Sequence, residues 1–226
     1  SALGAAGATP GYFGRIAAIC RANDILMISD EVICGFGRTG DWTGARHWGV
    51  KPDMMTIAKG ITSGYLPLGG VMVGARVVDV IRTSGGEFAH GYTYSGHPAA
   101  CAVALANIDI IQREKLVERV ADDIGPYLQK RWHELGEHPL VGETRMVGLM
   151  GAFEIVEDKE TLTRFDEKRE AGVVVRDICI DMGVVLRAVG DTMVCAPPLT
   201  LSYEEADTIV ETAFRALDKA KEVLGQ

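Results

Sequence analysis

Residues 25–31 read Ile-Leu-Met-Ile-Ser-Asp-Glu, a short apolar run that ends in two carboxylates. The run is rich in branched apolar residues and is bounded by turn residues, which predicts a buried strand of a parallel sheet over residues 25–29. Asp30 then falls at the carboxyl end of this strand, where open α/β sheets bind their ligands. The stretch therefore predicts a doubly wound sheet and the edge at which a site should be sought.

A second apolar run, Met-Met-Thr-Ile-Ala at residues 54–58, predicts another strand, and Lys59 follows it directly. If the two strands are neighbours, Asp30 and Lys59 face one cavity. A lysine amine can condense with an aldehyde, and a carboxylate can keep a pyridine nitrogen protonated. An ordinary ion pair uses the same two residue types, so the pair by itself leaves both interpretations open.

The sequence around these residues resembles that of class III pyridoxal-phosphate aminotransferases of fold type I. Within that family it is most similar to the ω-amine:pyruvate transaminases, including the putrescine/pyruvate type. The similarity covers nearly the whole chain and implies the C-terminal half only of such an enzyme. It is carried by the segments SDEVICGFGRTG (29–40), KPD (51–53), IAKG (57–60), HGYTYSGHP (90–98) and LRAVGD (186–191).

The resemblance implies an α/β fold with two parts. Residues 1–112 would be the C-terminal part of the large, doubly wound domain that binds the cofactor, and residues 113–226 would be the small α/β C-terminal domain. The polar run at residues 112–115 suits a helix that leaves the first domain for the second.

Local patterns predict the remaining elements. Apolar residues at helical spacing after Pro10 indicate a helix, and the capping pair Ser202 and Glu205 indicates the start of the last helix. The other predicted elements are a strand at 71–73, a turn-rich segment at 85–96, a long helix from residue 99 interrupted at Pro126, a strand at 146–156, a helix at 164–182 and a hairpin around Gly190.

The resemblance also implies roles for individual residues. Lys59 would bind the aldehyde of pyridoxal 5'-phosphate and move a proton during the reaction. Asp30 would hold the ring nitrogen protonated. Val32 is two residues past Asp30 and would point the same way in extended chain, and the resemblance implies that it packs against one face of the ring. Ile33 stands where the family often has Gln, which leaves the partner of the ring hydroxyl unidentified.

Two further residues would act on the cofactor phosphate and a third on the substrate. Thr93, with the backbone around Tyr92, would reach the phosphate in the partner subunit, so the active site would need a homodimer or a tetramer. Arg187 would bind the carboxylate of a keto acid, because a guanidinium can grip a carboxylate through two hydrogen bonds.

The function that follows is transamination: an amino group moves from an ω-amine or amino acid to a keto acid such as pyruvate by a ping-pong mechanism. Two alternatives stay open. The same cofactor could serve a decarboxylase, racemase or aminomutase, or the chain could be a truncated, inactive dimerisation module. The isolated chain is expected to be inactive, and the identity of the amine donor stays open.

Composition argues against several other classes of protein. The net charge of −8 disfavours nucleic acid and anionic membranes as partners. No apolar run reaches membrane-spanning length and no signal-peptide pattern opens the sequence. The five scattered cysteines form no CxxC pair, which favours a reducing cytoplasm.

Two motif-like patterns are rejected as ligand sites. Gly35, Gly37 and Gly40 match GxGxxG, but no helix with a sustained apolar stripe follows them, so nicotinamide binding is not expected. His133 and His138 are five residues apart and do not share a helix face, so no metal is expected.

Overall fold

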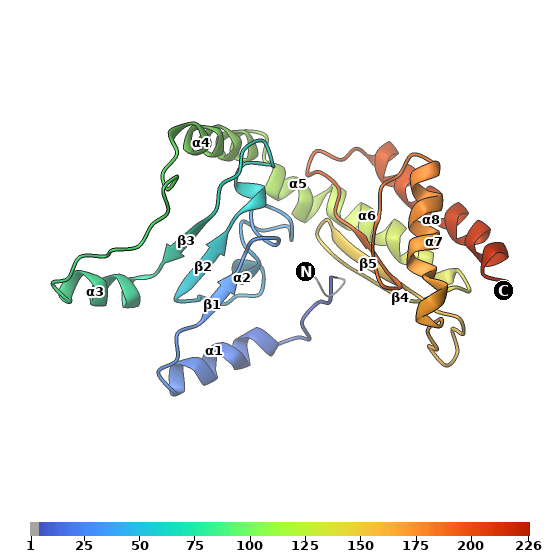
Figure 1. The fold of residues 1–226 in the computed structure, drawn as a ribbon, viewed down its shortest axis with the longest axis horizontal. Helices are drawn as coiled ribbons and strands as arrows, with labels where there is room; N and C mark the ends of the chain where they lie inside the picture. The colour runs from blue at the N-terminus through green and yellow to red at the C-terminus, as the bar shows by residue number, and fades with distance from the viewer. Residues whose placement is uncertain (1–4) are drawn as a thin grey trace. The chain divides into compact units, whose positions relative to one another are not determined.

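The computed structural model describes residues 5–226, which form two compact units (Figure 1). One unit is residues 8–118, and residues 5–7 group with residues 119–226 in the other. The assignment of residues 1–112 to a large domain and residues 113–226 to a small domain stays a prediction. Residues 1–4 of the predicted large domain lie outside the described range.

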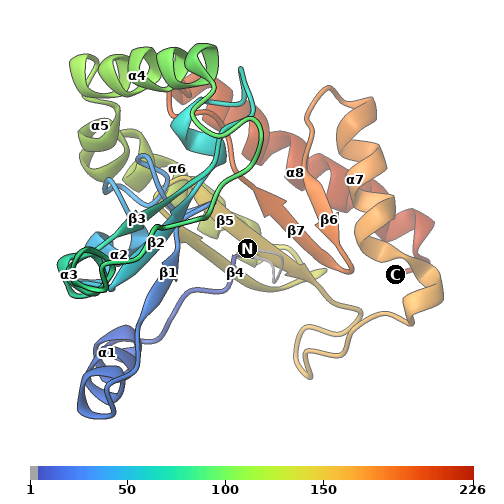
Figure 2. The same ribbon diagram turned by 60° about the vertical axis from the view of Figure 1, so that its left-hand side comes forward.

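The unit of residues 8–118 contains a three-stranded sheet in the order β1-β2-β3 (Figures 1 and 2). β1 and β2 are parallel, and β2 and β3 are antiparallel. Its elements are α1 (Tyr12–Ala22), β1 (Ile28–Asp30), α2 (Gly44–His47), β2 (Met54–Ile57), the 3-10 turn η1 (Lys59–Ile61), β3 (Gly70–Val73), α3 (Ala75–Thr83) and α4 (Pro98–Arg113). The helix after Pro10, the parallel pair and the strand that ends at Asp30 are thus confirmed.

The first strand differs from its prediction in length and burial. It begins at Ile28 rather than Ile25, because the backbone of Met27 bonds instead to Asp53, donating to its Oδ2 and accepting from its N–H, each at 2.8 Å. The strand is also not buried. Ile28 is 57% exposed, and in β3 Val71 is 58% exposed, because no described element covers these side chains.

The predicted break of the long helix at Pro126 is wrong. α4 ends at Arg113, and Lys115 takes a left-handed φ of 51° before α5 (Leu116–Asp122) begins. Pro126 lies in the first turn of α6 (Ile124–Glu134), where its missing N–H removes no helical hydrogen bond.

The unit of residues 119–226 contains an antiparallel sheet in the order β4-β5-β7-β6, with helices alongside it (Figure 2). Its strands are β4 (Val141–Val147), β5 (Met150–Ile155), β6 (Arg187–Val189) and β7 (Thr192–Cys195). The last part of α5, α6, the short turns η2 (Leu135–Glu137) and η3 (Glu167–Arg169), α7 (Ala171–Asp181) and α8 (Tyr203–Val223) complete it.

Two predicted elements of this unit are wrong in extent. The single strand expected at 146–156 is instead the end of β4, a turn and β5, because Gly148 adopts a left-handed φ of 54° and reverses the chain. The helix expected at 164–182 begins only at Ala171, after Glu170 has taken a left-handed φ of 46°. The hairpin around Gly190 is confirmed as β6 and β7.

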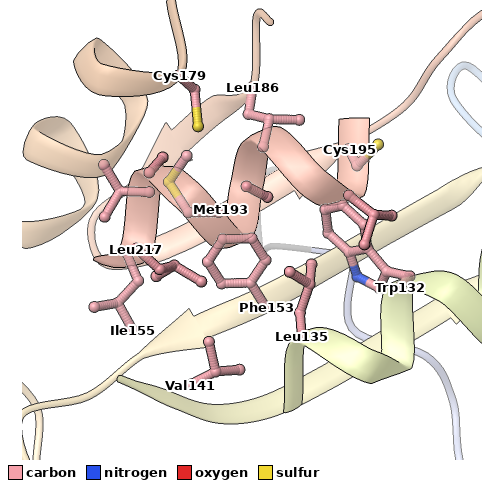
Figure 3. Close-up of a cluster of buried hydrophobic side chains, with 14 of the residues drawn as sticks. Trp132, Leu135, Val141, Phe153, Ile155, Cys179, Leu186, Met193, Cys195 and Leu217 are labelled. Carbon is pink, nitrogen blue, oxygen red and sulfur yellow. The ribbon is translucent and has the colours of Figure 1, made fainter. Parts of the chain in front are cut away.

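The core of this unit lies between the sheet and its helices (Figure 3). Trp132 of α6, Phe153 of β5 and Leu217 of α8 are fully buried and belong to one cluster. The indole N–H of Trp132 donates to Ala152 O at 3.1 Å, so the buried ring leaves no unpaired donor. Ser202 and Glu205 form the predicted capping box at the start of α8.

No helix within residues 5–226 is long and apolar enough to cross a membrane. The five cysteines, all in this described range, form no disulfide with one another.

Candidate active site

The carboxyl edge of β1 and β2 carries the two residues on which the predicted chemistry depends. Asp30 ends β1 and is paired in register with Thr56 of β2. β2 ends one residue later at Ile57, and Lys59 follows after Ala58. Because neighbouring strands lie about 4.8 Å apart and these two run in parallel, Asp30 and Lys59 lie at the same edge of the sheet.

The Asp30 carboxylate is oriented by two hydrogen bonds to one of its oxygens. Oδ1 accepts from the Val32 N–H at 3.1 Å and from the Thr56 hydroxyl at 3.0 Å. The other oxygen, Oδ2, has no hydrogen-bond or ion-pair partner among the described residues. An exposed carboxylate with one oxygen fixed and the other open can accept a hydrogen bond from the N–H of a protonated ring nitrogen.

Val32 reaches this place by a different route from the predicted one. The sequence predicts extended chain from Asp30 to Val32, but residues 32–39 form consecutive turns. That prediction is wrong, because the bond from the Val32 N–H to the Asp30 carboxylate folds the chain back at this point. Val32 itself is half-buried beside the carboxylate.

Glu31 is a further residue of the site, and the sequence reasoning missed it. It is 1% exposed and accepts hydrogen bonds from the Ser29 hydroxyl at 2.7 Å, from Gly44 N at 2.6 Å and from Ala45 N at 2.7 Å. These bonds tie the end of β1 to the first residues of α2. The glycine-rich loop between them is thereby closed into a fixed shape beside Asp30.

The closed loop leaves little room around Glu31. A Cβ on Gly44 would lie 2.9 Å from Cys34 Cβ and 3.2 Å from Glu31 Oε2, which explains a glycine at that position. Burial and the negative charge of Glu31 raise the pKa of the Cys34 thiol above its usual value. Cys34 therefore stays a neutral thiol near neutral pH and supplies no nucleophile here.

Lys59 begins the turn η1 with an exposed side chain and an unusual backbone. Its φ of 45° lies in the left-handed region, which residues with a Cβ rarely adopt. Its amine has no hydrogen-bond or ion-pair partner in the described part of the chain. An amine without a partner at the carboxyl edge of parallel strands is accessible to an aldehyde.

Tyr92 and Thr93 lie in the turn-rich segment between α3 and α4, as predicted, and both are exposed. Tyr92 is 82% exposed, and its backbone N–H donates to the Ser95 hydroxyl at 2.8 Å. That N–H is therefore already used within the turn. The Thr93 hydroxyl has no partner within residues 5–226, so of these two groups only the hydroxyl is free to bind a ligand.

Arg187 belongs to the unit of residues 119–226, where it begins β6 opposite Val194 of β7. Its side chain is exposed, and its guanidinium forms no ion pair with any described residue. The hairpin that carries it is held by α7, since Gly172 N donates to Asp191 Oδ1 at 3.1 Å.

The residues at the sheet edge fit the cofactor that the resemblance implies. Pyridoxal phosphate presents an aldehyde and a basic ring nitrogen, which require an amine and a carboxylate respectively. Lys59 and Asp30 supply these two groups at one edge, and neither the amine nor Oδ2 is engaged by another described residue. This edge therefore supplies one group for the aldehyde, the Lys59 amine, and one for the ring nitrogen, the Asp30 carboxylate.

Comparison with known proteins gives the same family throughout. The sequence model of the family described as aminotransferase class-III matches residues 1–217. A putrescine–pyruvate aminotransferase from Pseudomonas aeruginosa is 51% identical over 208 residues, which are 92% of this chain and 45% of the relative. A diaminobutyrate–2-oxoglutarate transaminase from Halomonas elongata is 44% identical over an alignment of 231 positions, which covers 98% of this chain and 49% of the relative.

Solved structures agree with the sequence relatives. A transaminase from the marine bacterium Virgibacillus superposes with a TM-score of 0.95 at 40% identity, over 100% of this chain and 52% of that one. An (S)-enantioselective ω-transaminase from Thermomicrobium roseum gives a TM-score of 0.89 at 45% identity, over 93% of this chain and 47% of that one. The chain thus spans about half the length of the relatives it matches.

The family model matches residues 1–217, the relatives and structures named above are at least 40% identical, and Asp30 and Lys59 lie at one edge of the sheet. The chain therefore belongs to the class-III aminotransferase family, with its α/β fold of type I.

Proposed function

We propose that the intact protein is a transaminase that moves an amino group from an ω-amine or amino acid to a keto acid such as pyruvate. The observation that carries this proposal is the placement of Asp30 and Lys59 at one edge of adjacent parallel strands. Class-III aminotransferases use pyridoxal 5'-phosphate, and the residues at this edge suit its two reactive ends.

When bound, pyridoxal phosphate supplies an electron sink that stabilises negative charge on the substrate carbon next to the nitrogen. In the proposed mechanism, Lys59 Nζ would hold the cofactor at its aldehyde carbon, and the same amine would take the proton from that substrate carbon and return it to the former aldehyde carbon. Asp30 Oδ2 accepts the hydrogen bond of the protonated ring nitrogen and keeps the ring cationic. Thr56 and the Val32 N–H hold Asp30 for this role through Oδ1.

The remaining predicted roles are part of the same proposal. Val32 would pack against the cofactor ring, and Thr93 would bind the phosphate of the cofactor in a partner subunit. The free hydroxyl of Thr93 supports its role, whereas the backbone N–H of Tyr92 would first have to leave Ser95. A homodimer follows if Thr93 acts across subunits, and we place the protein in the cytoplasm.

The names of two relatives support an amine donor and a keto acid acceptor as substrates. The Pseudomonas aeruginosa relative is named for putrescine and pyruvate, and the Halomonas elongata relative for diaminobutyrate and 2-oxoglutarate. We propose a diamine or a related ω-amine as donor, with pyruvate as the first acceptor to test.

Dependence on the acceptor is the experiment that tests the reaction type. The intact protein, loaded with pyridoxal phosphate, should release about one aldehyde product per site from a diamine when no keto acid is present, because the amino group then stays on the cofactor. Addition of pyruvate should restore continuous turnover and give alanine. In a parallel reaction with an amino acid in place of the diamine, continuous release of carbon dioxide or of an isomerised amino acid without a keto acid would contradict transamination and favour a decarboxylase, racemase or aminomutase.

Replacement of Arg187 with Ala should raise KM for pyruvate by about 10- to 100-fold, the effect expected when a hydrogen bond to a charged group is lost. KM for a diamine should change by less than about threefold, because a diamine presents no carboxylate to the guanidinium. Steady-state kinetics with each substrate varied in turn measures both values.

Arg187→Lys is the matched control for charge. It keeps the positive charge but loses the planar fork, so its KM for pyruvate should fall between the values of the unsubstituted protein and Arg187→Ala. Equal losses for pyruvate and diamine in Arg187→Ala would contradict a carboxylate clamp and indicate a structural role for this arginine.

A further inference from the structure

The backbone of Lys59 is held in a conformation that it would not keep by itself. Its φ is 45°, and Ala58 before it is fully extended, so the chain turns sharply as it leaves β2. A left-handed residue with a Cβ persists only when its surroundings hold it there, and such residues concentrate at functional sites.

The turn after Lys59 provides part of the support. The N–H groups of Ile61 and Thr62 donate to Ala58 O and Lys59 O, each at 3.2 Å. Ile61 is buried, and the Thr62 hydroxyl donates to Leu66 O at 2.6 Å. A Cβ on Gly60 would lie 3.1 Å from Phe36 Cβ, so the glycine lets the turn sit against that ring.

The other support comes from one side chain on α4. Asn107 Nδ2 donates to Gly60 O at 2.9 Å and to Ile61 O at 3.1 Å. Its Oδ1 accepts the Ser63 hydroxyl at 2.7 Å. The amide of Asn107 therefore bonds to three of the four residues that follow Lys59, through its NH2 group and its oxygen, across 44 to 47 residues of sequence.

We propose that Asn107 is a positioning residue that fixes the backbone at Lys59 and so sets the direction from which the lysine amine approaches the cofactor. This inference rests on the proposed function only for the role of the amine. The contacts with residues 60–63 are independent of it. No other side chain of the described residues donates to the carbonyl of Gly60 or Ile61.

Asn107→Asp is the sharpest variant, because it keeps the size and the acceptor for Ser63 but cannot donate to the two carbonyls. Asn23 is the only other asparagine in the sequence, and its Nδ2 donates to Ile19 O at 2.9 Å near the end of α1. Asn23→Asp is therefore a matched control: the same chemical change removes a bond to a backbone carbonyl away from the site.

The first measurement is amide hydrogen exchange of the intact protein without cofactor. In Asn107→Asp the amides of residues 61–63 should exchange about tenfold faster, as expected when a local opening becomes easier, while those of β4 and β5 are unchanged. In Asn23→Asp the amides of residues 61–63 should exchange as in the unsubstituted protein. Equal exchange in the two variants would overturn the proposal.

The second measurement uses the protein loaded with pyridoxal phosphate. If the amine is displaced, the pH midpoint of the visible absorbance should shift by about half a unit or more, and kcat should fall about tenfold with KM for the amine within about threefold. Faster exchange with an unchanged midpoint and an unchanged kcat would also overturn the proposal, because Asn107 would then support only the backbone.

A variant with a smaller change keeps the proposal testable if Asn107→Asp does not fold. Ser63→Ala removes the bond to Asn107 Oδ1 but keeps both carbonyl bonds, so its effects should be smaller and in the same direction. The two proposals also fail separately. If Lys59→Ala keeps normal turnover, the proposed function fails, whereas the exchange of residues 61–63 still decides whether Asn107 holds this backbone.

Discussion

Replacement of Lys59 with Ala should reduce transaminase turnover of the intact protein by roughly 1,000-fold or more and abolish the visible absorbance of the bound cofactor. The amine is proposed to serve twice, as the group that binds the aldehyde and as the group that moves the proton. Removal of a proton-transfer group alone costs about 100- to 10,000-fold in rate. No other lysine of the described residues follows β1 or β2 at this edge, so no neighbour can substitute for it.

Lys115→Ala is a stringent control for this variant. Lys115 is also an exposed lysine with a left-handed backbone, at a φ of 51°, in the same unit of the chain. Both replacements therefore impose the same backbone conformation on an alanine. Lys115→Ala should keep turnover and absorbance close to those of the unsubstituted protein. Turnover of Lys59→Ala within about tenfold of the unsubstituted protein would contradict the assignment of this lysine.

Gly172→Ala should destabilise the unit of residues 119–226 by about 3 kcal/mol or more, at the upper end of the range for overpacked sites. Gly172 lies in the first turn of α7, and a Cβ there would come within 2.0 Å of Gly190 O and 3.1 Å of Asp191 Cα. These atoms belong to the backbone, so no rotation of a side chain relieves the clash. The turn that must move joins β6 to β7, and β6 carries Arg187.

The urea midpoint of unfolding, followed by far-UV circular dichroism, measures this effect. Gly14→Ala in α1 is the matched control, because a Cβ on Gly14 meets nothing within 4 Å. That change should stabilise α1 by about 0.5–1 kcal/mol, the usual preference of a helix for alanine over glycine. A Gly172→Ala midpoint equal to that of the unsubstituted protein would contradict the close approach of α7 to the hairpin.

The sequence was sufficient to predict the edge of the site, for a clear physical reason. Two short apolar runs separated by a loop are typical of neighbouring strands, and in a parallel pair both carboxyl ends fall on one edge. The common edge of Asp30 and Lys59 could therefore be predicted without coordinates, whereas their roles came from the family resemblance. The capping box of α8 was equally accessible, because it depends only on Ser202 and Glu205 three residues apart.

The contacts that shape the site could not be predicted in this way. Thr56 meets Asp30 only because the strands pair in one particular register, and Asn107 reaches Gly60 across 47 residues of sequence. Neither pairing has a local signal. The Asp-Glu sequence at residues 30–31 gave no sign that the first carboxylate would be exposed and the second 1% exposed.

Backbone reversals were the other source of error. Val32, Lys115 and Glu170 were all predicted within extended or helical segments. Each lies at a turn, and Lys115 and Glu170 have a positive φ without being glycine. Residues with a Cβ seldom adopt this conformation, so a sequence pattern does not predict it and tertiary contacts must impose it. The prediction of one strand at 146–156 was wrong for a simpler reason, because the turn at Gly148 was not recognised in the sequence.

Reduction of the loaded protein with sodium borohydride tests the central claim most directly, because it fixes the cofactor covalently to the amine that holds it. The intact protein is incubated with pyridoxal phosphate, reduced, digested and analysed by mass spectrometry. The account predicts that the added mass lies on Nζ of Lys59 and is absent from Lys59→Ala. Attachment to a different lysine, or an active protein that carries the added mass nowhere, would contradict it.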